Sequence, residues 1–261
     1  MKFSTEAKKF ISLVESAMVK KGSVSLIPEP NISILKNSIA LINASARNDI
    51  ASVVVAKKEY FSTLENDEKR TIIIEQEILD RLNEGFTSGD TTFTCEHDMF
   101  FAQDGTDRIE AELKFSDPTK KFPIPLTQTT YGLITDLNKW KAKESEEWDE
   151  EKSLKGFNVY KTTAEALSLP KRDSYEISLK DGTLIATLPG TTTKMSHKID
   201  GESVIGKKGR FLIDGEFYRN IVSNLEGEVY LIYNKNAIMF TCSSETLSKT
   251  YSAAARVETE G

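Results

Sequence analysis

The sequence predicts an α+β protein made of two domains that repeat one plan, and three observations support this prediction. Residues 72–103 and residues 211–242 share the same order: three apolar residues and an acid, an amphipathic helix with one arginine, and two alternating strands. In this comparison Glu77 corresponds to Glu216, and Leu82 corresponds to Ile221. Short runs of alternating polar and apolar residues fill much of the remaining chain, as is typical of antiparallel strands. A chain that repeats one unit in this way can close a ring.

The length and composition agree with two globular domains. At 261 residues the chain is long enough for two domains of about 100–150 residues each. With 39% hydrophobic and 28% charged residues it has ample material for two cores. We expect an N-terminal domain over residues 1–117, a connector over residues 118–155 and a C-terminal domain over residues 156–261.

Charge and cysteine content exclude several classes of protein. The N-terminal segment is interrupted by charge every few residues, so it is neither a signal peptide nor a membrane span. The two cysteines, Cys95 and Cys242, lack metal-type spacing, which indicates a reducing compartment, cytoplasmic or nuclear, and no secretion. The net charge of −6 argues against a protein that coats nucleic acid, although a local basic face stays compatible with it.

In the first half the pattern predicts two helices among short strands. The first helix is expected to begin at a Ser4 or Thr5 cap and to end at Gly22. Strands are expected near residues 23–29, 31–37, 49–61 and 71–75, followed by a second helix over residues 76–84 and strands at 91–97, 99–103 and 108–115.

The second half is expected to follow the same order. Residues 156–160 predict a strand, residues 162–169 a short helix ended by Pro170, and residues 215–225 a second helix. Strands are expected at residues 174–180, 183–188, 192–199, 209–214, 227–233, 237–243 and 248–258. The four helices of the two halves would then lie on one side of the sheets.

The region between the halves has a different character. Residues 118–130 contain prolines and read as extended chain, and residues 138–155 form a charge-dense run with Trp140 and Trp148. This run is either a solvated linker or surface helix, or an element on which a partner docks, because exposed tryptophans are good anchors.

No catalytic motif is present. G-x-S-x-G, the P-loop and G-x-G-x-x-G are all missing from the sequence. Cys95 and His97 would share one face of a strand, but two ligands do not make a zinc site. His197 lies on an expected strand without a nucleophile pattern near it. We therefore expect a non-enzymatic protein that needs no metal and no cofactor.

Several stretches resemble one family, the DNA sliding clamps of the proliferating-cell nuclear antigen type. The run DIASVVVAKKEYFS resembles a family strand that is followed by an acidic and aromatic turn, and IIIEQEILDRLNEG resembles the second helix with its preceding strand. The closing KTYSAAARVE is similar to the terminal strand of the family. The resemblance implies two repeated clamp domains, with antiparallel sheets outside and two helices per domain inside, that form a ring. The insert around Trp140 and Trp148, and Ala255 where the family prefers proline, indicate a divergent member of viral or phage origin that acts inside the host cell.

The resemblance also implies a function and its partners. A clamp is a processivity factor: it encircles double-stranded DNA without reading sequence and tethers the replicative DNA polymerase. The implied assembly is a homotrimer with no membrane contact, and the sequence leaves open whether a clamp loader places it on DNA or the ring opens spontaneously. Basic side chains that contact the DNA phosphates are expected on the helices that line the hole of the ring. These DNA-facing candidates are Lys8, Lys9, Lys20, Lys21, Arg81, Lys171, Arg172 and Arg219.

Family clients insert a peptide between the connector, a loop of the first domain and the C-terminal strand. Carried over by position, this partner site comprises Ile50, Phe122, Ile124, Leu126, Ala253, Ala254 and Ala255. The subunits are expected to meet through residues 71–75 or 91–97 of one copy and residues 175–180 or 183–188 of the next. Two alternatives stay open: a monomeric processivity factor of the herpesvirus type, and a non-enzymatic structural or oligomeric viral protein.

Overall fold

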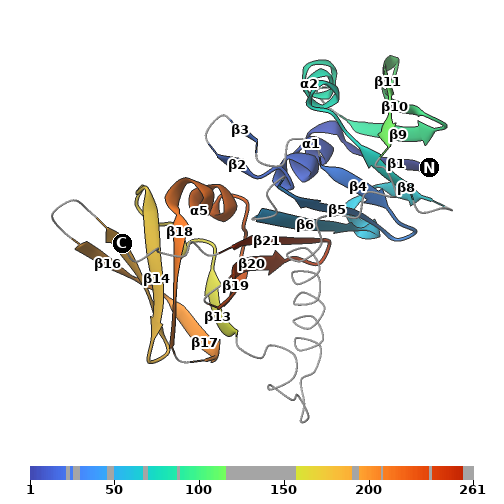
Figure 1. Cartoon of the computed structure of the whole chain (residues 1–261). Coiled ribbons are helices and arrows are strands. Elements are labelled where there is room, and N and C mark those ends of the chain that lie inside the picture. The colour runs from blue at the N-terminus through green and yellow to red at the C-terminus, as the bar shows by residue number, and fades with distance from the viewer. Residues whose placement is uncertain are drawn as a thin grey trace, which may run out of the picture.

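The structure is a computed structural model, shown in Figure 1. It describes residues 1–21, 24–25, 30–45, 50–66, 70–86, 89–115, 157–189, 194–206, 208–234 and 237–254. Within these residues the chain forms antiparallel sheets with helices along one side of them (Figure 1). The predicted α+β class is confirmed.

One sheet belongs entirely to the N-terminal half and has the strand order β11-β10-β9-β1-β7. Its core-facing aromatic rings pack closely, with the ring centroid of Phe3 4.8 Å from that of Phe93 and the ring of Phe10 4.6 Å from that of Phe93. The strands are β1 (Lys2–Glu6), β7 (Thr63–Glu65), β9 (Asp90–Glu96), β10 (Met99–Asp104) and β11 (Asp107–Glu112).

A ten-stranded sheet runs through both halves, in the order β12-β8-β4-β5-β6-β21-β20-β19-β13-β17. The two halves join where β6 pairs with β21, with Val53 opposite Thr250 and Ile50 opposite Ala253. The strands are β12 (Lys114–Phe115), β8 (Arg70–Ile73), β4 (Asn31–Ile34), β5 (Ser38–Ala44), β6 (Ile50–Lys57), β21 (Leu247–Ala254), β20 (Ala237–Ser243), β19 (Glu228–Tyr233), β13 (Asn158–Thr163) and β17 (Gly201–Ile205).

Two smaller sheets complete the described strands. The four-stranded sheet of the C-terminal half has the order β16-β15-β14-β18. These strands are β16 (Lys194–Ile199), β15 (Thr183–Pro189), β14 (Ser174–Lys180) and β18 (Lys208–Asp214). A short hairpin pairs β2 (Lys20–Lys21) with β3 (Val24–Ser25).

The described helices are α1 (Ala7–Ser16), α2 (Gln76–Gly85) and α5 (Gly215–Val222), with one 3-10 turn, η1 (Lys58–Tyr60). Figure 1 shows them on the same side of the sheets, in the order α2, α1, the β2–β3 hairpin and α5. α1 and α2 pack against each other, and β2 packs beside α5. In the described part of the chain no helix is long and apolar enough to span a membrane.

Each half has its own apolar core. The N-terminal core surrounds Phe3, Phe10 and Phe93, and the C-terminal core surrounds Tyr175, Tyr218 and Phe240. Two cores are what two similar units require, because each amphipathic layer must bury its own face. The exact division at residues 117 and 118 stays a prediction, because residues 116–156 lie outside the described residues.

The prediction for the first helix was wrong at both ends. Residues 2–6 form strand β1, which pairs with β7 on one side and with β9 on the other, so neither Ser4 nor Thr5 caps a helix. The helix ends at Ser16, whose hydroxyl is buried and donates to the carbonyl oxygen of Leu13 at 2.7 Å.

The predicted helix over residues 162–169 is a single turn. The amide of Leu167 donates to the carbonyl oxygen of Thr163 at 3.3 Å, and no second turn follows. Pro170 stops the continuation, because it lacks an amide hydrogen and its ring disfavours helix in the residue before it. Strands β5, β7 and β17 are additions to the predicted elements.

Candidate nucleic-acid interface

The helices α1, α2 and α5 carry four of the eight cations that the sequence assigns to DNA. Lys8 and Lys9 are exposed on α1, Arg81 is exposed on α2, and Arg219 is half-buried on α5. The shared side of these helices is the only candidate DNA surface that the predicted residues define in the described part of the chain. The local contacts decide which of these charges face solvent freely.

Lys9 is held against the protein. Its Nζ donates to the carbonyl oxygen of Tyr60 at 2.6 Å and lies 4.2 Å from the centroid of the Tyr60 ring. The Tyr60 hydroxyl in turn donates to the carbonyl oxygen of Lys9 at 3.2 Å. Burial, and to a lesser extent the charge of Glu226, raises the pKa of Tyr60 to about 12. Lys8 is therefore the freer of the two cations on α1.

Arg81 is compensated within its own helix. Its Nη2 lies 2.5 Å from Oε1 of Glu77, one turn earlier, with both side chains well exposed. Glu77, Asp80 and Glu84 outnumber the single arginine on α2, and all three are exposed. A helix with this net negative charge repels phosphate, so α2 is a poor DNA contact.

Arg219 positions a neighbouring basic segment. Its Nη1 donates to the carbonyl oxygen of Arg172 at 2.6 Å and to the Tyr175 hydroxyl at 3.2 Å. This holds the segment with Lys171 and Arg172 against the start of α5, where both side chains are exposed. Gly215 permits the close approach, because a Cβ there would lie 2.0 Å from the carbonyl oxygen of Arg172.

Lys20 and Lys21 were predicted on the first helix, and this was wrong. Both belong to β2, because the chain leaves α1 after Ser16 and pairs with β3. β2 packs beside α5, so the two residues still lie on the helix-bearing side of the protein (Figure 1).

The described part of the predicted partner site comes together in space. Ile50 and Ala253 are direct partners in the β6–β21 pairing, and Ala254 follows as an exposed residue. Ile50 and Ala253 are themselves buried in the C-terminal core. Phe122, Ile124, Leu126 and Ala255 lie outside the described residues.

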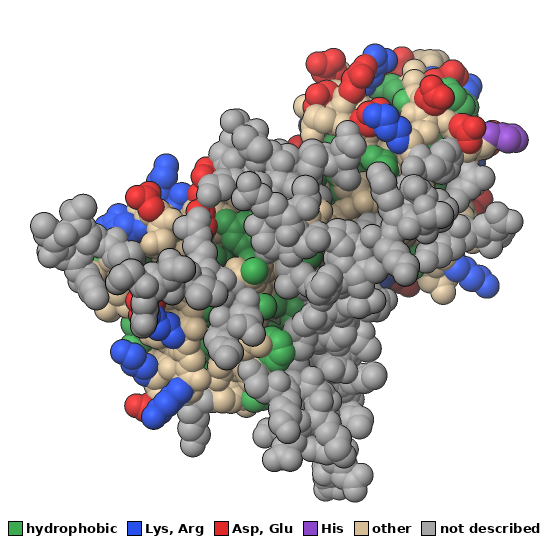
Figure 2. Space-filling view, in the orientation of Figure 1, with side chains coloured by type: hydrophobic (Ala, Val, Ile, Leu, Met, Phe, Trp, Pro, Cys, Tyr) green, Lys and Arg blue, Asp and Glu red, His purple; other side chains and the backbone are tan. Residues whose placement is uncertain are grey.

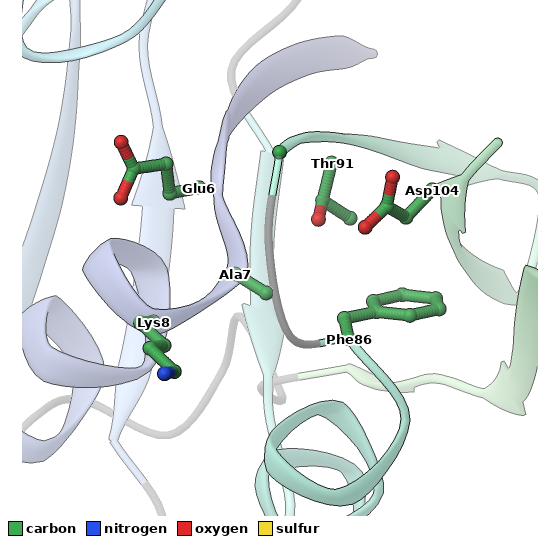
Figure 3. Close-up of a pocket in the computed structure, with 7 residues that line it drawn as sticks. Glu6, Ala7, Lys8, Phe86, Thr91 and Asp104 are labelled. Carbon is green, nitrogen blue, oxygen red and sulfur yellow. The ribbon is translucent and has the colours of Figure 1, made fainter.

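The described part of the structure contains a small cavity and an open groove. Figure 3 shows a cavity at the start of α1, lined by Glu6, Ala7, Lys8, Phe86, Gly89, Thr91 and Asp104. Its volume of about 30 Å³ suits a single water, and the buried Thr91 hydroxyl lacks a hydrogen-bond partner in the structure. The cavity is too small for a substrate.

The second hollow is an open groove of about 670 Å³ on the four-stranded sheet. Its lining contains both acidic and basic side chains. It includes Ser178 but no histidine, so the serine has no histidine as a general base to activate it as a nucleophile. It is lined by Glu176, Ser178, Leu179, Lys180, Asp181, Lys208, Gly209 and Arg210. Among the described residues no group of three or more histidine, cysteine or acidic side chains could hold a metal.

Cys95 and His97 were expected on one strand face, and the structure corrects this. Cys95 is buried on β9, whereas His97 lies in the turn after β9 with a positive φ of 51°. The two side chains therefore do not share a strand face.

The predicted subunit-contact strands are not available for pairing. β8 is paired with β12 and β4, β9 with β1 and β10, β14 with β15 and β18, and β15 with β14 and β16. A strand with both edges occupied has no free backbone groups to offer another chain. The sequence does not show which strands form the edge of a sheet, and this is why the prediction failed.

Duplicated antiparallel sheets with helices along one side are the fold of the DNA sliding clamps, and the solved structures show this directly. The chain superposes on the PCNA of A. fulgidus bound to the C-terminal region of FEN-1, with TM-score 0.69 and 13% identity over 99% of each chain. It superposes on the PCNA of Thermococcus kodakaraensis with TM-score 0.68 and 13% identity, over 98% of this chain and 99% of that chain.

A third similar structure is the PCNA2–PCNA3 complex of Sulfolobus tokodaii, with TM-score 0.68 and 10% identity over 98% of this chain and 99% of that chain. No protein-family model and no curated protein matches the sequence. The resemblance in the sequence is confirmed at the level of the fold.

Proposed function

We propose that this protein is a DNA sliding clamp, a processivity factor that encircles duplex DNA and tethers a DNA polymerase. The observation that carries the proposal is the agreement of nearly the whole chain, 99% of it, with a PCNA structure. Partial agreement would leave room for a different assembly, whereas agreement over both halves preserves the arrangement on which encirclement depends.

The charges on the helix side suit a protein that moves along DNA. Sequence-independent contact requires cations near phosphates and no donors aimed at base edges. Lys8, Lys171 and Arg172 are exposed there, while Lys9 and Arg81 are engaged with their own chain. Few free cations and an acidic α2 give a weak field, which allows sliding because tight binding would oppose it.

The assembly we propose is a homotrimeric ring. One similar structure is a complex of PCNA2 with PCNA3, so two chains of this fold associate with each other there. A ring needs two complementary edges on each copy, which meet as heterologous contacts. Loading by a clamp loader and action inside the cell, in cytoplasm or nucleus, belong to the same proposal, as does a viral or phage origin.

Client proteins are proposed to dock beside the β6–β21 junction. A similar structure has the C-terminal region of FEN-1 bound to PCNA. In this chain Ile50 and Ala253 form the junction, and Ala254 next to them is exposed. With Phe122, Ile124, Leu126 and Ala255 they would accept the apolar anchors of a polymerase. The protein acts by binding and not by catalysis.

Mass and processivity measured together test this function. Light scattering should give about three times the mass of 29.2 kDa of one chain. Addition of the protein should lengthen the products of its polymerase on primed circular DNA, and should help less on linear DNA, from which a ring slides off. A monomer that stimulates fully on both templates would overturn the ring and favour the herpesvirus-type alternative, and a trimer without stimulation would favour the structural one.

A further inference from the structure

The open groove on the four-stranded sheet contains two lysines that face each other. Lys180 of β14 lies directly opposite Lys208 of β18 in the register of the two strands, and both side chains are exposed. Like charges directly opposite each other destabilise a pair of strands. Neither lysine forms an ion pair with another described residue. A negatively charged group bound between them would therefore stabilise this end of the sheet.

The rest of the groove keeps this positive character. Arg210 follows Lys208 on the same face of β18, and its Nη2 lies 3.1 Å from Oε2 of Glu176. The three cations of the lining outnumber its two acids, Glu176 and Asp181. Figure 2 shows lysine and arginine side chains over the part of the C-terminal half where Figure 1 places β14 and β18. Since Glu176 is engaged with Arg210, the lysine pair carries the charge that is open to a ligand.

The densest run of acids in the sequence has the opposite character. Residues 144–151, ESEEWDEE, contain six acids and no basic residue within eight positions. This acidic run belongs to the charge-dense insert by which the sequence differs from the sliding clamps that it resembles. It lies outside the described residues, so its place on the protein has to be argued from the residues around it.

The chain that follows the acidic run returns to the described structure beside the groove. β13 begins at Asn158, seven residues after Glu151. The side chain of Asn158 packs against the start of β18, because a Cβ on Gly209 would lie 2.6 Å from the Asn158 Nδ2. Gly209 itself lines the groove, next to Lys208. Seven residues span at most about 25 Å even when fully extended, so the acidic run stays close to the groove.

This short tether favours the acidic run over other acidic ligands. Single exposed ion pairs are weak, and a free peptide would gain little from them. A segment on a short linker, however, meets its site at an effective concentration on the order of millimolar. Single-stranded nucleic acid is a poorer match, because the described lining of the groove has no aromatic side chain on which bases could stack.

We infer that the groove between β14 and β18 binds the acidic run 144–151 of the same chain, with carboxylates of the run beside Lys180 and Lys208. The docking does not require a ring, so it goes beyond the proposed function. It holds Trp148 against the C-terminal half. Because the charges are exposed, raising the salt from about 0.1 M to about 1 M shortens the screening length from about 10 Å to about 3 Å and releases the run.

The fluorescence of Trp148 measures the docking. The chain has two tryptophans, so Trp140→Phe leaves Trp148 as the only one. Acrylamide, a neutral quencher, then reports how exposed Trp148 is at about 0.1 M and at about 1 M salt. Quenching should be weak at low salt, where the run is docked, and should rise as the salt releases it.

Charge reversal in this Trp140→Phe parent identifies the groove. Lys180→Glu with Lys208→Glu should lower the ratio of docked to released run about tenfold or more at low salt, because like charges then meet. Glu150→Lys with Glu151→Lys should lower it as well. The variant that combines all four changes exchanges the signs, and it should quench as weakly as the parent.

A matched control separates the groove from general charge effects. Lys57→Glu with Lys58→Glu makes the same change of charge at exposed residues of the N-terminal half, and its quenching should equal that of the parent. Circular dichroism confirms the folding of each variant. Quenching that responds neither to salt nor to the reversal of Lys180 and Lys208 would overturn the inference. Quenching that rises on dilution would overturn it in favour of a second copy as the source of the run, and release of the run by equimolar oligothymidine would overturn it in favour of nucleic acid.

Discussion

Removal of the cations beside α5 should weaken DNA retention, whereas removal of Arg81 should not. The perturbation is the double change Lys171→Ala and Arg172→Ala, compared with Arg81→Ala. The double change spares the fold, because Arg219 binds the backbone carbonyl of Arg172 and not its side chain. Arg81 is already paired with Glu77 on an acidic helix, so it contributes little to contact with DNA. We therefore expect Arg81→Ala to leave DNA retention nearly unchanged.

The expected magnitude follows from counterion release. Each phosphate contact contributes about 0.9 to the slope of log K against log salt concentration. Loss of two contacts per copy should lower the slope by about 1.8 per engaged copy. When the salt rises from about 50 mM to about 200 mM, each phosphate contact contributes a loss of affinity for DNA of roughly 3.5-fold, and two contacts contribute roughly 12-fold. The double variant should lack this roughly 12-fold part of the salt dependence of the wild type.

The assay is release of the protein from closed circular DNA, followed across a salt series by filtration on a sizing column. Circular dichroism and light scattering of each variant control for folding and assembly. Equal losses in the Arg81→Ala and the double variant would refute the reasoning, because they would show that α2 faces DNA in spite of its acids. No loss in the double variant would refute the placement of Lys171 and Arg172.

Three further predictions concern the supports of the site. Gly215→Ala should destabilise the fold by about 2–3 kcal/mol and displace the basic segment, because the new Cβ would meet the carbonyl oxygen of Arg172. Gly85→Ala is the control, because a Cβ at Gly85 has no neighbour closer than 4.0 Å, and it should leave the stability unchanged. Thermal unfolding of the two variants measures the difference. Since the pKa of Tyr60 is raised to about 12, its contribution to the free energy of unfolding is complete below about pH 10 and is lost between about pH 10 and about pH 12. In Tyr60→Phe the midpoint of urea unfolding should depend less on pH over that range than it does in the wild type. An equal dependence of the midpoint on pH in both proteins would contradict the assignment. The double change Ile124→Ser and Leu126→Ser should abolish polymerase stimulation while the trimer persists. A ring that dissociates instead would show that the connector is structural, and the docking site for client proteins would then be sought at Trp140 and Trp148.

The second helix of each half could be predicted because its sequence carries the whole signal. In α2 the apolar residues Ile78, Leu79 and Leu82 recur at helical spacing and are buried, and in α5 Phe217 and Ile221 do the same. Asp214 strengthens α5 further, because its carboxylate accepts from the amides of Glu216 and Phe217. Local pattern and tertiary burial agree in both helices.

The first residues could not be predicted because local pattern and tertiary pairing disagree there. Phe3, Ala7 and Phe10 lie at helical spacing in the sequence, yet Phe3 belongs to a strand that two neighbours select by pairing. The same applies to Lys20, which reads as the next polar position of a helix but pairs with Ser25. Which cations are free also depended on distant contacts, such as that of Lys9 with Tyr60.

The pairing of β6 with β21 has a consequence for how this protein is made. The Tyr251 hydroxyl donates to the carbonyl oxygen of Ser16 across 235 residues of chain, so the sheet of the first half is finished by a strand synthesised long after it. Contacts this distant slow folding, because the loop must close before they form. Until then β6, with its run Val53, Val54 and Val55, presents an unpaired edge that invites aggregation. The N-terminal half expressed alone should therefore be insoluble, and addition of a peptide with the sequence of β21 should rescue it.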